Sequence, residues 1–238
     1  MSQIISLDGN IGAGKSTILN HIKELYENQT DIVFLPEPVS DWETIRDRVS
    51  NETALEAFYR DQEKYSFPFQ MMAYISRLKL LQDAVEKYPN AIIVTERCLN
   101  TDRYVFAKML HDNKKMKDIE YQIYLKWFDY FIDKFQNLQK TIYMKTSPEI
   151  CLERIRKRSR DGEENIALEY LRSCHNYHED MISALDSKNV LIIDSDIDIE
   201  EEVVYKDIWL RNIQSFISSS TEKMEKLDII VPNVELSV

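Results

Sequence analysis

Three of the four glycines in this 238-residue chain lie in one short segment. Gly9, Gly12 and Gly14 belong to GNIGAGKST, which fits the pattern G-x-x-x-x-G-K-[ST] of a phosphate-binding loop. Such a loop needs glycine because the backbone N–H groups that surround a phosphate require positive φ angles and close approach without a Cβ. An apolar segment precedes the pattern and a helical one follows it, so a chance glycine-rich turn is a poor alternative.

The polar residues of this loop have the chemistry of nucleotide binding. We expect Lys15 to reach the β and γ phosphates of a nucleoside triphosphate and the Ser16 hydroxyl to bind Mg²⁺. The chain lacks the N-K-x-D and D-x-x-G motifs of GTPases, and its glycines are too few for the signature loop of a transporter ATPase. The predicted nucleotide-binding residues are Gly9, Asn10, Ile11, Gly12, Ala13, Gly14, Lys15, Ser16 and Thr17.

Two acids follow apolar segments that resemble strands. Glu37 lies between two prolines after residues 32–35, where the carboxyl end of a strand in an α/β fold meets its ligand, and it could accept the proton of an attacking hydroxyl. Glu96 follows AIIVT at the place of the second metal-organising carboxylate of P-loop enzymes. Arg97, beside it, could neutralise Glu37 or the transferred phosphate. An exposed loop acid and a surface ion pair are the alternatives.

A basic run stands out in a chain of net charge −11. Its cations are spaced so that Arg154 and Arg158 share one helical face, as do Arg156 and Arg160. Gly162 follows them. We interpret the run as a mobile basic flap that closes on the transferred phosphate, with a solvated helix face as the alternative.

Aromatic residues and one amide could form a flat pocket. Gln70 follows Phe69 and could form paired hydrogen bonds with a planar ligand. Arg77 lies seven residues later, about two helical turns, so it can face the same pocket. The aromatic candidates are Trp42, Tyr59, Phe69 and Phe106, for which core packing is the alternative.

The elements that must position these residues alternate along the chain. Five short apolar segments predict buried parallel strands, and helical patterns fill the gaps between them. We therefore predict an α/β P-loop kinase fold: a five-stranded parallel sheet flanked by helices, with a basic lid, in one domain spanning residues 1–238. The expected strands are 3–7, 32–35, 91–95, 141–144 and 190–193. The expected helices are 16–26, 52–65, 67–87, 102–111, 118–135, 148–157, 167–185 and 200–218, and residues 219–238 are a tail left unassigned.

Composition limits the partners. A net charge of −11 argues against a surface that coats nucleic acid. The three cysteines, Cys98, Cys151 and Cys174, show no paired or metal-binding spacing, which suits a reducing compartment. No signal or transit peptide and no run of about 18 apolar residues is present, so we expect no membrane partner and a cytoplasmic location, with the nucleus also open.

The motifs resemble one family over residues 3–218. GNIGAGKST, EPVSDW, FPFQMMAYISR, ERCLNTDRYVFA and RIRKRSRDGEENIALEYL occur in the order found in deoxynucleoside kinases, the family of deoxycytidine and deoxyguanosine kinases and the insect broad-range enzyme. The resemblance implies a dimer formed through a helical bundle, here 67–87 and 118–135. It also implies transfer of the γ-phosphoryl group of ATP or another NTP, with Mg²⁺, to the 5′-hydroxyl of a deoxynucleoside.

The resemblance implies a role for each matching residue. Glu37 is the implied general base, and Arg97 steadies it and the 5′ oxygen. Ser16 and Glu96 organise Mg²⁺. The remaining implied roles are the flap arginines Arg154, Arg158 and Arg160; Gln70 on the base edge; Phe69 and Phe106 around the ring; Trp42 closing the pocket; Tyr59 and Glu163 on the sugar 3′-hydroxyl; Asp196 near the donor base; and Asp102 paired with Arg77.

The sequence departs from the family pattern in two motifs, and its C-terminal tail has no counterpart in that pattern. Cys98 stands where the E-R-S motif has serine, and the flap reads RDGEEN, which leaves the choice of Glu163 over Glu164 open. The Arg77–Asp102 pair resembles that of deoxycytidine and deoxyguanosine kinases, so we expect deoxyadenosine, deoxyguanosine or deoxycytidine to be preferred over thymidine. A thymidylate-type monophosphate kinase and a catalytically silent scaffold of the same fold are the rival functions.

Overall fold

The computed structural model describes residues 2–132, 135 and 139–228. The chain divides into two compact units, residues 1–197 and residues 198–238. The first unit carries every predicted site residue. The prediction of one domain over the whole chain stays a prediction.

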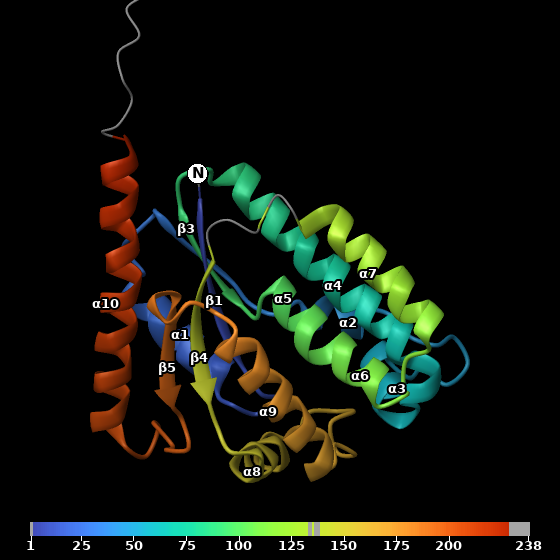
Figure 1. The fold of residues 1–238 in the computed structure, drawn as a ribbon. Helices are drawn as coiled ribbons and strands as arrows, with labels where there is room; N and C mark the ends of the chain where they lie inside the picture. The colour runs from blue at the N-terminus through green and yellow to red at the C-terminus, as the bar shows by residue number, and fades with distance from the viewer. Residues whose placement is uncertain (1, 133–134, 136–138, 229–238) are drawn as a thin grey trace, which may run out of the picture. The chain divides into compact units, whose positions relative to one another are not determined.

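The first unit is built on a five-stranded sheet in which every neighbouring pair is parallel (Figure 1). The strand order is β2-β3-β1-β4-β5, so β1, which leads into the glycine-rich loop, lies at the centre. All residues of β1 and β3 are buried, as strands covered on both faces must be. The strands are β1 (Gln3–Gly9), β2 (Ile32–Leu35), β3 (Ile92–Glu96), β4 (Gln139–Lys145) and β5 (Val190–Asp194). The predicted sheet is confirmed.

Helices connect and flank the strands. Figure 1 shows α4 and α7 side by side, and the two helices contact one another. The helices of this unit are α1 (Lys15–Leu25), α2 (Val39–Glu43), α3 (Ala54–Arg60), α4 (Gln62–Lys87), α5 (Leu99–Thr101), the π-helix η1 (Asp102–Ala107), α6 (Lys108–Asp112), α7 (Asp118–Ile132), α8 (Pro148–Arg158), α9 (Leu168–Ser183) and the 3₁₀-helix η3 (Ser187–Asn189).

The predicted break between two helices near Phe67 is wrong. The break falls at Asp61, whose φ of −145° and ψ of 81° leave the helical region. Its carboxylate caps α4 by accepting a hydrogen bond from the Lys64 N–H, 3.2 Å away. Pro68 lies within α4, in its second turn, where it removes one backbone hydrogen bond without ending the helix. One continuous helix therefore carries Phe69, Gln70 and Arg77 toward the site.

Two further boundaries differ from the sequence prediction. The short helix α2 contains the segment after Glu37, which the sequence analysis left without structure. In the second unit, α10 (Val203–Asp228) begins later than predicted and continues past residue 218, so part of the unassigned tail is helical. Residues 229–238 of that tail lie outside those described. Among the described helices, none has both the length and the apolar character that crossing a bilayer requires.

Candidate active site

The glycine-rich loop joins β1 to α1 and has the backbone that its glycines predict. Gly12 and Gly14 have φ angles of 79° and 84°, in the left-handed region. A Cβ on Gly12 would lie 2.5 Å from the backbone oxygen of Cys151, in α8. Gly12 is thus required both by its backbone conformation and by the close approach of α8.

Lys15 is buried at the first turn of α1, and its Nζ donates to the backbone oxygen of Asn10, 2.8 Å away. Burial, helped by the positive charge of Arg97, lowers the pKa of Lys15 to about 8. The ammonium lies in the loop where a phosphate would bind. A bound phosphate would therefore favour its charged form.

Ser16 and Glu96 supply a pair of oxygen ligands beside Lys15. The Ser16 Oγ donates to Oε1 of Glu96 over 2.8 Å, which joins the start of α1 to the end of β3. Hydroxyl and carboxylate oxygens are the hard ligands that Mg²⁺ prefers, usually with phosphate oxygens completing the shell. These two residues fit a magnesium site of that kind.

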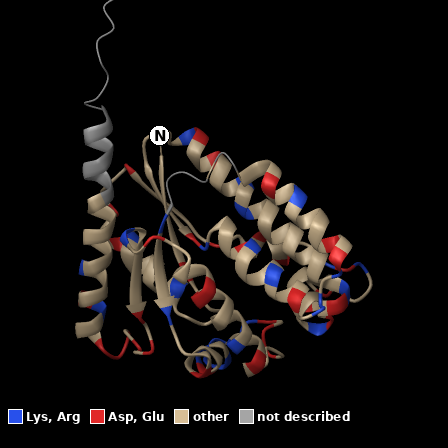
Figure 2. Ribbon diagram, in the orientation of Figure 1, with Lys and Arg blue, Asp and Glu red and all other residues tan. Residues whose placement is uncertain are grey.

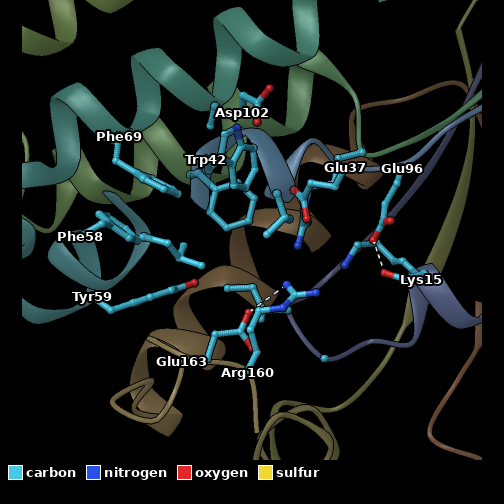
Figure 3. Close-up of a pocket in the computed structure, with 18 of the residues that line it drawn as sticks. Lys15, Glu37, Trp42, Phe58, Tyr59, Phe69, Glu96, Asp102, Arg160 and Glu163 are labelled. Atoms are coloured by element: carbon cyan, nitrogen blue, oxygen red, sulfur yellow. Dashed lines mark hydrogen bonds and ion pairs between the residues drawn. The ribbon is translucent and has the colours of Figure 1, made fainter. Parts of the chain in front are cut away.

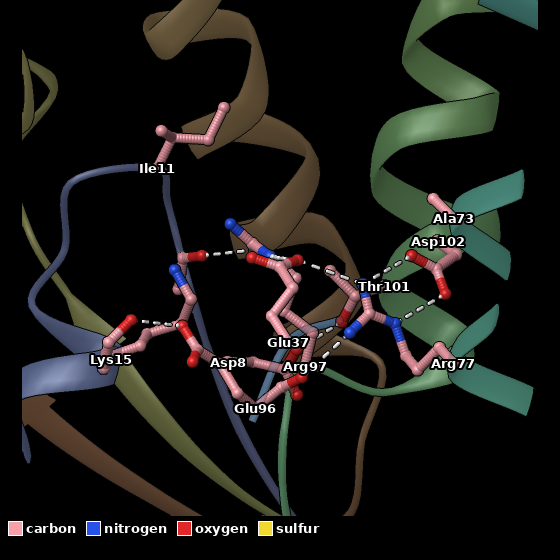
Figure 4. Close-up of polar contacts among 12 residues, drawn as sticks. Asp8, Ile11, Lys15, Glu37, Ala73, Arg77, Glu96, Arg97, Thr101 and Asp102 are labelled. Carbon is pink, nitrogen blue, oxygen red and sulfur yellow. Dashed lines mark hydrogen bonds and ion pairs between the residues drawn. The ribbon is translucent and has the colours of Figure 1, made fainter. Parts of the chain in front are cut away.

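Glu37, at the end of β2, is held between two arginines (Figure 4). Its Oε1 accepts from Arg97 Nε at 3.1 Å and from Arg77 Nη2 at 3.0 Å. Burial alone would raise the pKa of Glu37, but the charges of Arg97 and Arg77 outweigh burial and lower this pKa to about 2. The carboxylate is therefore ionised at neutral pH.

Arg97 reaches Glu37 from an uncommon backbone conformation. Its φ is 63°, in the left-handed region that few residues other than glycine adopt. The guanidinium donates through Nη1 to the backbone oxygen of Gly9, 2.7 Å away, and lies over the Phe106 ring at 4.9 Å. One arginine thus contacts the P-loop, the candidate base and an aromatic wall of the pocket.

Arg77 and Asp102 form the predicted buried pair. Arg77 Nε lies 2.9 Å from Asp102 Oδ2, and Arg77 Nη1 donates to the backbone oxygen of Glu96 at 2.9 Å. Burial raises the pKa of Asp102, although the Arg77 guanidinium opposes that rise. With Glu37 also bound, most N–H groups of Arg77 already have protein partners.

The aromatic residues form walls around an open space, as Figure 3 shows for Phe69, Trp42 and Tyr59. Phe69 stacks on Phe58, with ring centroids 4.5 Å apart and planes at 10°. Trp42 meets Phe69 edge-on at 5.6 Å, and its Nε1 donates to Ser76 Oγ at 2.9 Å. Phe58 was not predicted from the sequence, although it lies three residues after Leu55, a spacing that places both side chains on one helical face.

The basic flap, residues 154–171, contains the end of α8 and the loop after it. Figure 2 shows Lys and Arg at α8, whose last turn carries Arg156, Lys157 and Arg158. Arg158 Nη2 donates to one oxygen of Glu163, and Arg160 Nη1 donates to the other at 3.4 Å. Two of the three predicted flap arginines, Arg158 and Arg160, therefore share one carboxylate.

Glu163 and Glu164 occupy different environments. Glu163 is buried and lines the cavity, whereas Glu164 is exposed. Tyr59 and Glu163 line the same cavity, and burial, followed by the charge of Glu163, raises the pKa of Tyr59. A Cβ on Gly162 would lie 2.9 Å from Glu56 Cγ, so the flap loop packs closely on α3.

One cavity of about 200 Å³ brings most of the predicted residues together. Those that line it are Ile11, Gly12, Gly14, Lys15, Ser16, Thr17, Glu37, Trp42, Tyr59, Phe69, Gln70, Arg77, Glu96, Arg97, Asp102, Phe106, Arg158, Arg160 and Glu163. Five lining residues were not predicted from the sequence: Val39, Leu55, Phe58, Ala73 and Tyr170. Ala73 could have been found, because it lies four residues from both Phe69 and Arg77 on α4.

Five predicted residues lie outside the lining of this cavity: Gly9, Asn10, Ala13, Arg154 and Asp196. Arg154 lies near Gly14 and donates to the backbone oxygens of Ser195 and Ile197, each at 2.9 Å. Asp196 is exposed, and its Oδ1 accepts from the Ser147 N–H at 2.6 Å. The role of Arg154 as a flap arginine and that of Asp196 near the donor base stay predictions.

Comparison with known proteins agrees with this geometry. Residues 5–218 match the model of the deoxynucleoside kinase family. Deoxycytidine kinase of Rattus norvegicus is 30% identical, with 91% of each chain covered. A probable deoxycytidine kinase of fowlpox virus (strain NVSL) is 34% identical over 90% of this chain and 88% of the relative. A mitochondrial deoxyguanosine kinase of Xenopus laevis is 28% identical over 90% of this chain and 89% of its own. The P-loop, the paired arginines on Glu37 and this match over most of the chain show that the protein belongs to the deoxynucleoside kinase family.

Proposed function

We propose that the protein transfers the γ-phosphoryl group of ATP, or of another NTP, to the 5′-hydroxyl of a deoxynucleoside in nucleotide salvage. As a member of its family, the protein is a nucleoside kinase. The main support for this proposed reaction is the position of the Glu37 side chain. Its carboxylate lies in one cavity with the P-loop lysine and the aromatic pocket, so an acceptor hydroxyl there would face a phosphate on the loop.

Glu37 is the proposed acceptor of the hydroxyl proton. Its two arginines hold the carboxylate in one orientation and keep it charged. A carboxylate with so low a pKa is a weak base toward a free alcohol. In a loose phosphoryl-transfer transition state the hydroxyl becomes acidic as its bond to phosphorus forms, so a well-oriented weak base is enough.

The negative charge of the transferred group is stabilised by cations that already surround the cavity. Lys15 lies in the P-loop, Arg97 lies beside Glu37, and Arg158 and Arg160 lie on the flap. Preorganised cations of this kind favour the transition state over the ground state. Ser16 and Glu96 would hold Mg²⁺, which, when bound, neutralises charge on the phosphate oxygens.

The acceptor is proposed to fill the aromatic half of the cavity. Gln70 would bond the base edge, Phe69 and Phe106 would cover the two faces of the ring, and Trp42 would close the pocket. Tyr59 and Glu163 would bind the sugar 3′-hydroxyl. We propose that the Arg77–Asp102 pair occupies the space that a thymine methyl would need, so that deoxyadenosine, deoxyguanosine or deoxycytidine is preferred.

Two rival functions make different predictions in one experiment. A thymidylate-type monophosphate kinase would need cations for the acceptor's own phosphate, whereas here Glu37 stands at that position. A silent scaffold would not need an intact Lys15, Glu37, Glu96 and Arg97. ATP-dependent phosphorylation of radiolabelled deoxynucleosides and their monophosphates separates the three. Label on deoxynucleosides alone supports the proposal, label on monophosphates alone supports the rival kinase, and no label supports the scaffold.

A homodimer through α4 and α7 is also proposed. Large apolar side chains of these helices are exposed, among them Trp127 at 48% and Tyr130 at 75% on α7, with Ile75 on α4. Exposed large apolar side chains on two neighbouring helices are typical of a protein interface. For the location we propose the cytoplasm, with the nucleus as the alternative.

A further inference from the structure

Asp8 is a buried carboxylate that the proposed mechanism does not use. It lies in β1 immediately before the P-loop, is fully buried, and accepts the hydroxyl hydrogen bond of Thr101 at Oδ1 (Figure 4). Its Oδ2 is buried and has no hydrogen-bond partner among the described residues. A buried carboxylate with one unsatisfied oxygen costs stability, so stable packing alone does not explain its presence.

Thr101 connects Asp8 and Cys98 through its hydroxyl group. Its hydroxyl donates a hydrogen bond to Asp8. The Thr101 oxygen can therefore accept a hydrogen bond from the Cys98 thiol, 3.2 Å away. Burial, with the charge of Asp8, raises the pKa of Cys98 to about 12, so the thiol keeps the proton that it donates. Thr101 is itself fully buried, and its Oγ1 also lies 4.0 Å from Met181 Sδ. Contacts with Asp8, Cys98 and Met181 therefore hold the Thr101 hydroxyl in place.

The Asp8–Thr101 bond connects the two halves of the active site. On one side, Asp8 is followed by Gly9, whose backbone oxygen accepts from Arg97 Nη1. On the other side, Thr101 is followed by Asp102, the first residue of the π-helix η1. From Asp102 the contacts continue through Arg77 to Glu37. The bond thus ties the strand that carries the P-loop to the helix that presents the base-pocket acid.

We infer that Asp8 and Thr101 are positioning residues, which hold Asp102, and through it Arg77 and Glu37, in register with the P-loop. Neither residue lines the cavity, so both act through others. π-helical turns are rare and concentrate at functional sites, which agrees with an anchored start of η1. This inference rests on the proposed function, because it concerns the acceptor side of that reaction.

The test compares two variants of Thr101 that differ in the hydroxyl. Thr101→Val keeps the branched shape and removes the hydroxyl, whereas Thr101→Ser keeps the hydroxyl and removes the methyl. We expect Thr101→Val to lower kcat/KM for the best deoxynucleoside at least tenfold, about 1.4 kcal/mol of transition-state stabilisation. The KM for ATP should change less than twofold, and Thr101→Ser should stay within threefold of the wild type in both measures. Asp8→Asn, which keeps an acceptor oxygen, should retain more activity than Asp8→Ala.

Hydrogen exchange of the amides of residues 102–107 gives a readout that does not depend on turnover. In Thr101→Val, loss of the hydrogen bond to Asp8 should speed amide exchange in residues 102–107, while exchange in the centre of β1 stays unchanged. Equal kinetics and equal exchange for Thr101→Val and wild type would overturn the inference. The inference would also be overturned if Thr101→Val impaired the kinetics with the nucleoside and with ATP equally and Thr101→Ser showed the same loss. A purely structural residue would behave in this way. A wild-type protein that phosphorylates no deoxynucleoside would instead refute the proposed function, and the exchange comparison would still decide whether Thr101 anchors η1.

Discussion

Arg77 Nη2 lies 3.0 Å from Glu37 Oε1, so the arginine that faces the base pocket also contacts the proposed catalytic base. The same guanidinium bonds Asp102 through Nε. The proposed base recognition and the proposed proton transfer therefore depend on one shared side chain. Substitutions intended to change selectivity should also change turnover, because residues in one polar network do not act independently.

The double variant Arg77→Met with Asp102→Ala should open the pocket to thymidine. Removing both charges avoids leaving one of them buried without its partner. We expect the kcat/KM for thymidine, relative to the best natural substrate, to rise at least tenfold, about 1.4 kcal/mol, while kcat falls because Glu37 has lost one arginine. Steady-state kinetics on a deoxynucleoside panel measures both effects.

The single variant Arg77→Met is the control for that experiment. It leaves Asp102 buried without its guanidinium, a change that typically costs about 3–5 kcal/mol of stability. It should therefore unfold at a lower temperature than the double variant. A wild-type enzyme that already prefers thymidine would contradict our interpretation of the pocket while leaving the kinase assignment intact.

Glu37→Gln should retain nucleoside binding and lose the proton acceptor. The amide has the same shape as the carboxylate, and loss of a general base typically lowers the rate by about 10²–10⁴. Single-turnover kinetics with saturating ATP measures this step. Glu43→Gln, at an exposed residue of the short helix α2 that follows Glu37, is the matched control and should behave as wild type. A fall in kcat of less than about tenfold would show that Glu37 is not the base.

ATP binding should weaken at alkaline pH. The pKa of Lys15 in the ligand-free protein is lowered to about 8 by burial, so its ammonium, which attracts phosphate, is lost as the pH rises through 8. Because phosphate favours the charged form, the apparent Kd of a non-hydrolysable ATP analogue should be flat below pH 7 and should rise above pH 8. Calorimetric titrations from pH 6.5 to 9.5 measure this dependence. The same series with Lys15→Ala should show weak binding and a flatter profile; an equally steep profile in that variant would assign the titration to another group.

Glu163→Gln should affect the two substrates in opposite ways. The carboxylate holds Arg158 and Arg160 before phosphate arrives, so its neutralisation frees these cations for the donor. The same change weakens the proposed bond to the sugar 3′-hydroxyl. We expect the KM for the deoxynucleoside to rise about tenfold and the KM for ATP to stay level or fall. Its exposed neighbour provides the control, since Glu164→Gln should leave both KM values unchanged; a rise in nucleoside KM for Glu164→Gln alone would exchange the two assignments.

A charged residue on the exposed face of α7 should disrupt the proposed dimer. Trp127→Glu places a charge beside the exposed Tyr130, and burial of an unpaired charge in an interface is strongly unfavourable. Sedimentation velocity should show a dimer for wild type and a monomer for the variant at micromolar concentration. Val49→Glu, at a side chain that is 97% exposed and remote in sequence from both helices, should remain dimeric. A monomeric wild type would refute the dimer and leave the fold of the protomer unaffected.

Local chemistry explains what could be predicted from the sequence. The P-loop was recognisable because its backbone needs positive φ angles, which glycine adopts readily. The strands were recognisable because parallel strands that are buried on both faces consist of continuous apolar residues. The end of a parallel strand is also a predictable place for a functional residue, so Glu37 and Glu96 were found. The helix break at Asp61 was missed because a capping carboxylate and a non-helical dihedral angle determine it, and Pro68 suggested a different boundary.

The sequence by itself determined the candidate residues for the chemistry, because phosphate binding, proton transfer and metal binding each demand particular side chains at particular spacings. Only the tertiary structure decided which of them meet. Glu37 and Arg77 are forty residues apart, and Asp8 and Thr101 are ninety-three apart, so no local pattern connects either pair. The lining roles of Phe58 and Ala73, the contact of Glu163 with two flap arginines, and the anchoring of η1 depend on how the sheet and helices pack. The physical reason is that contacts between distant segments are set by the burial of the whole core, which no single motif encodes.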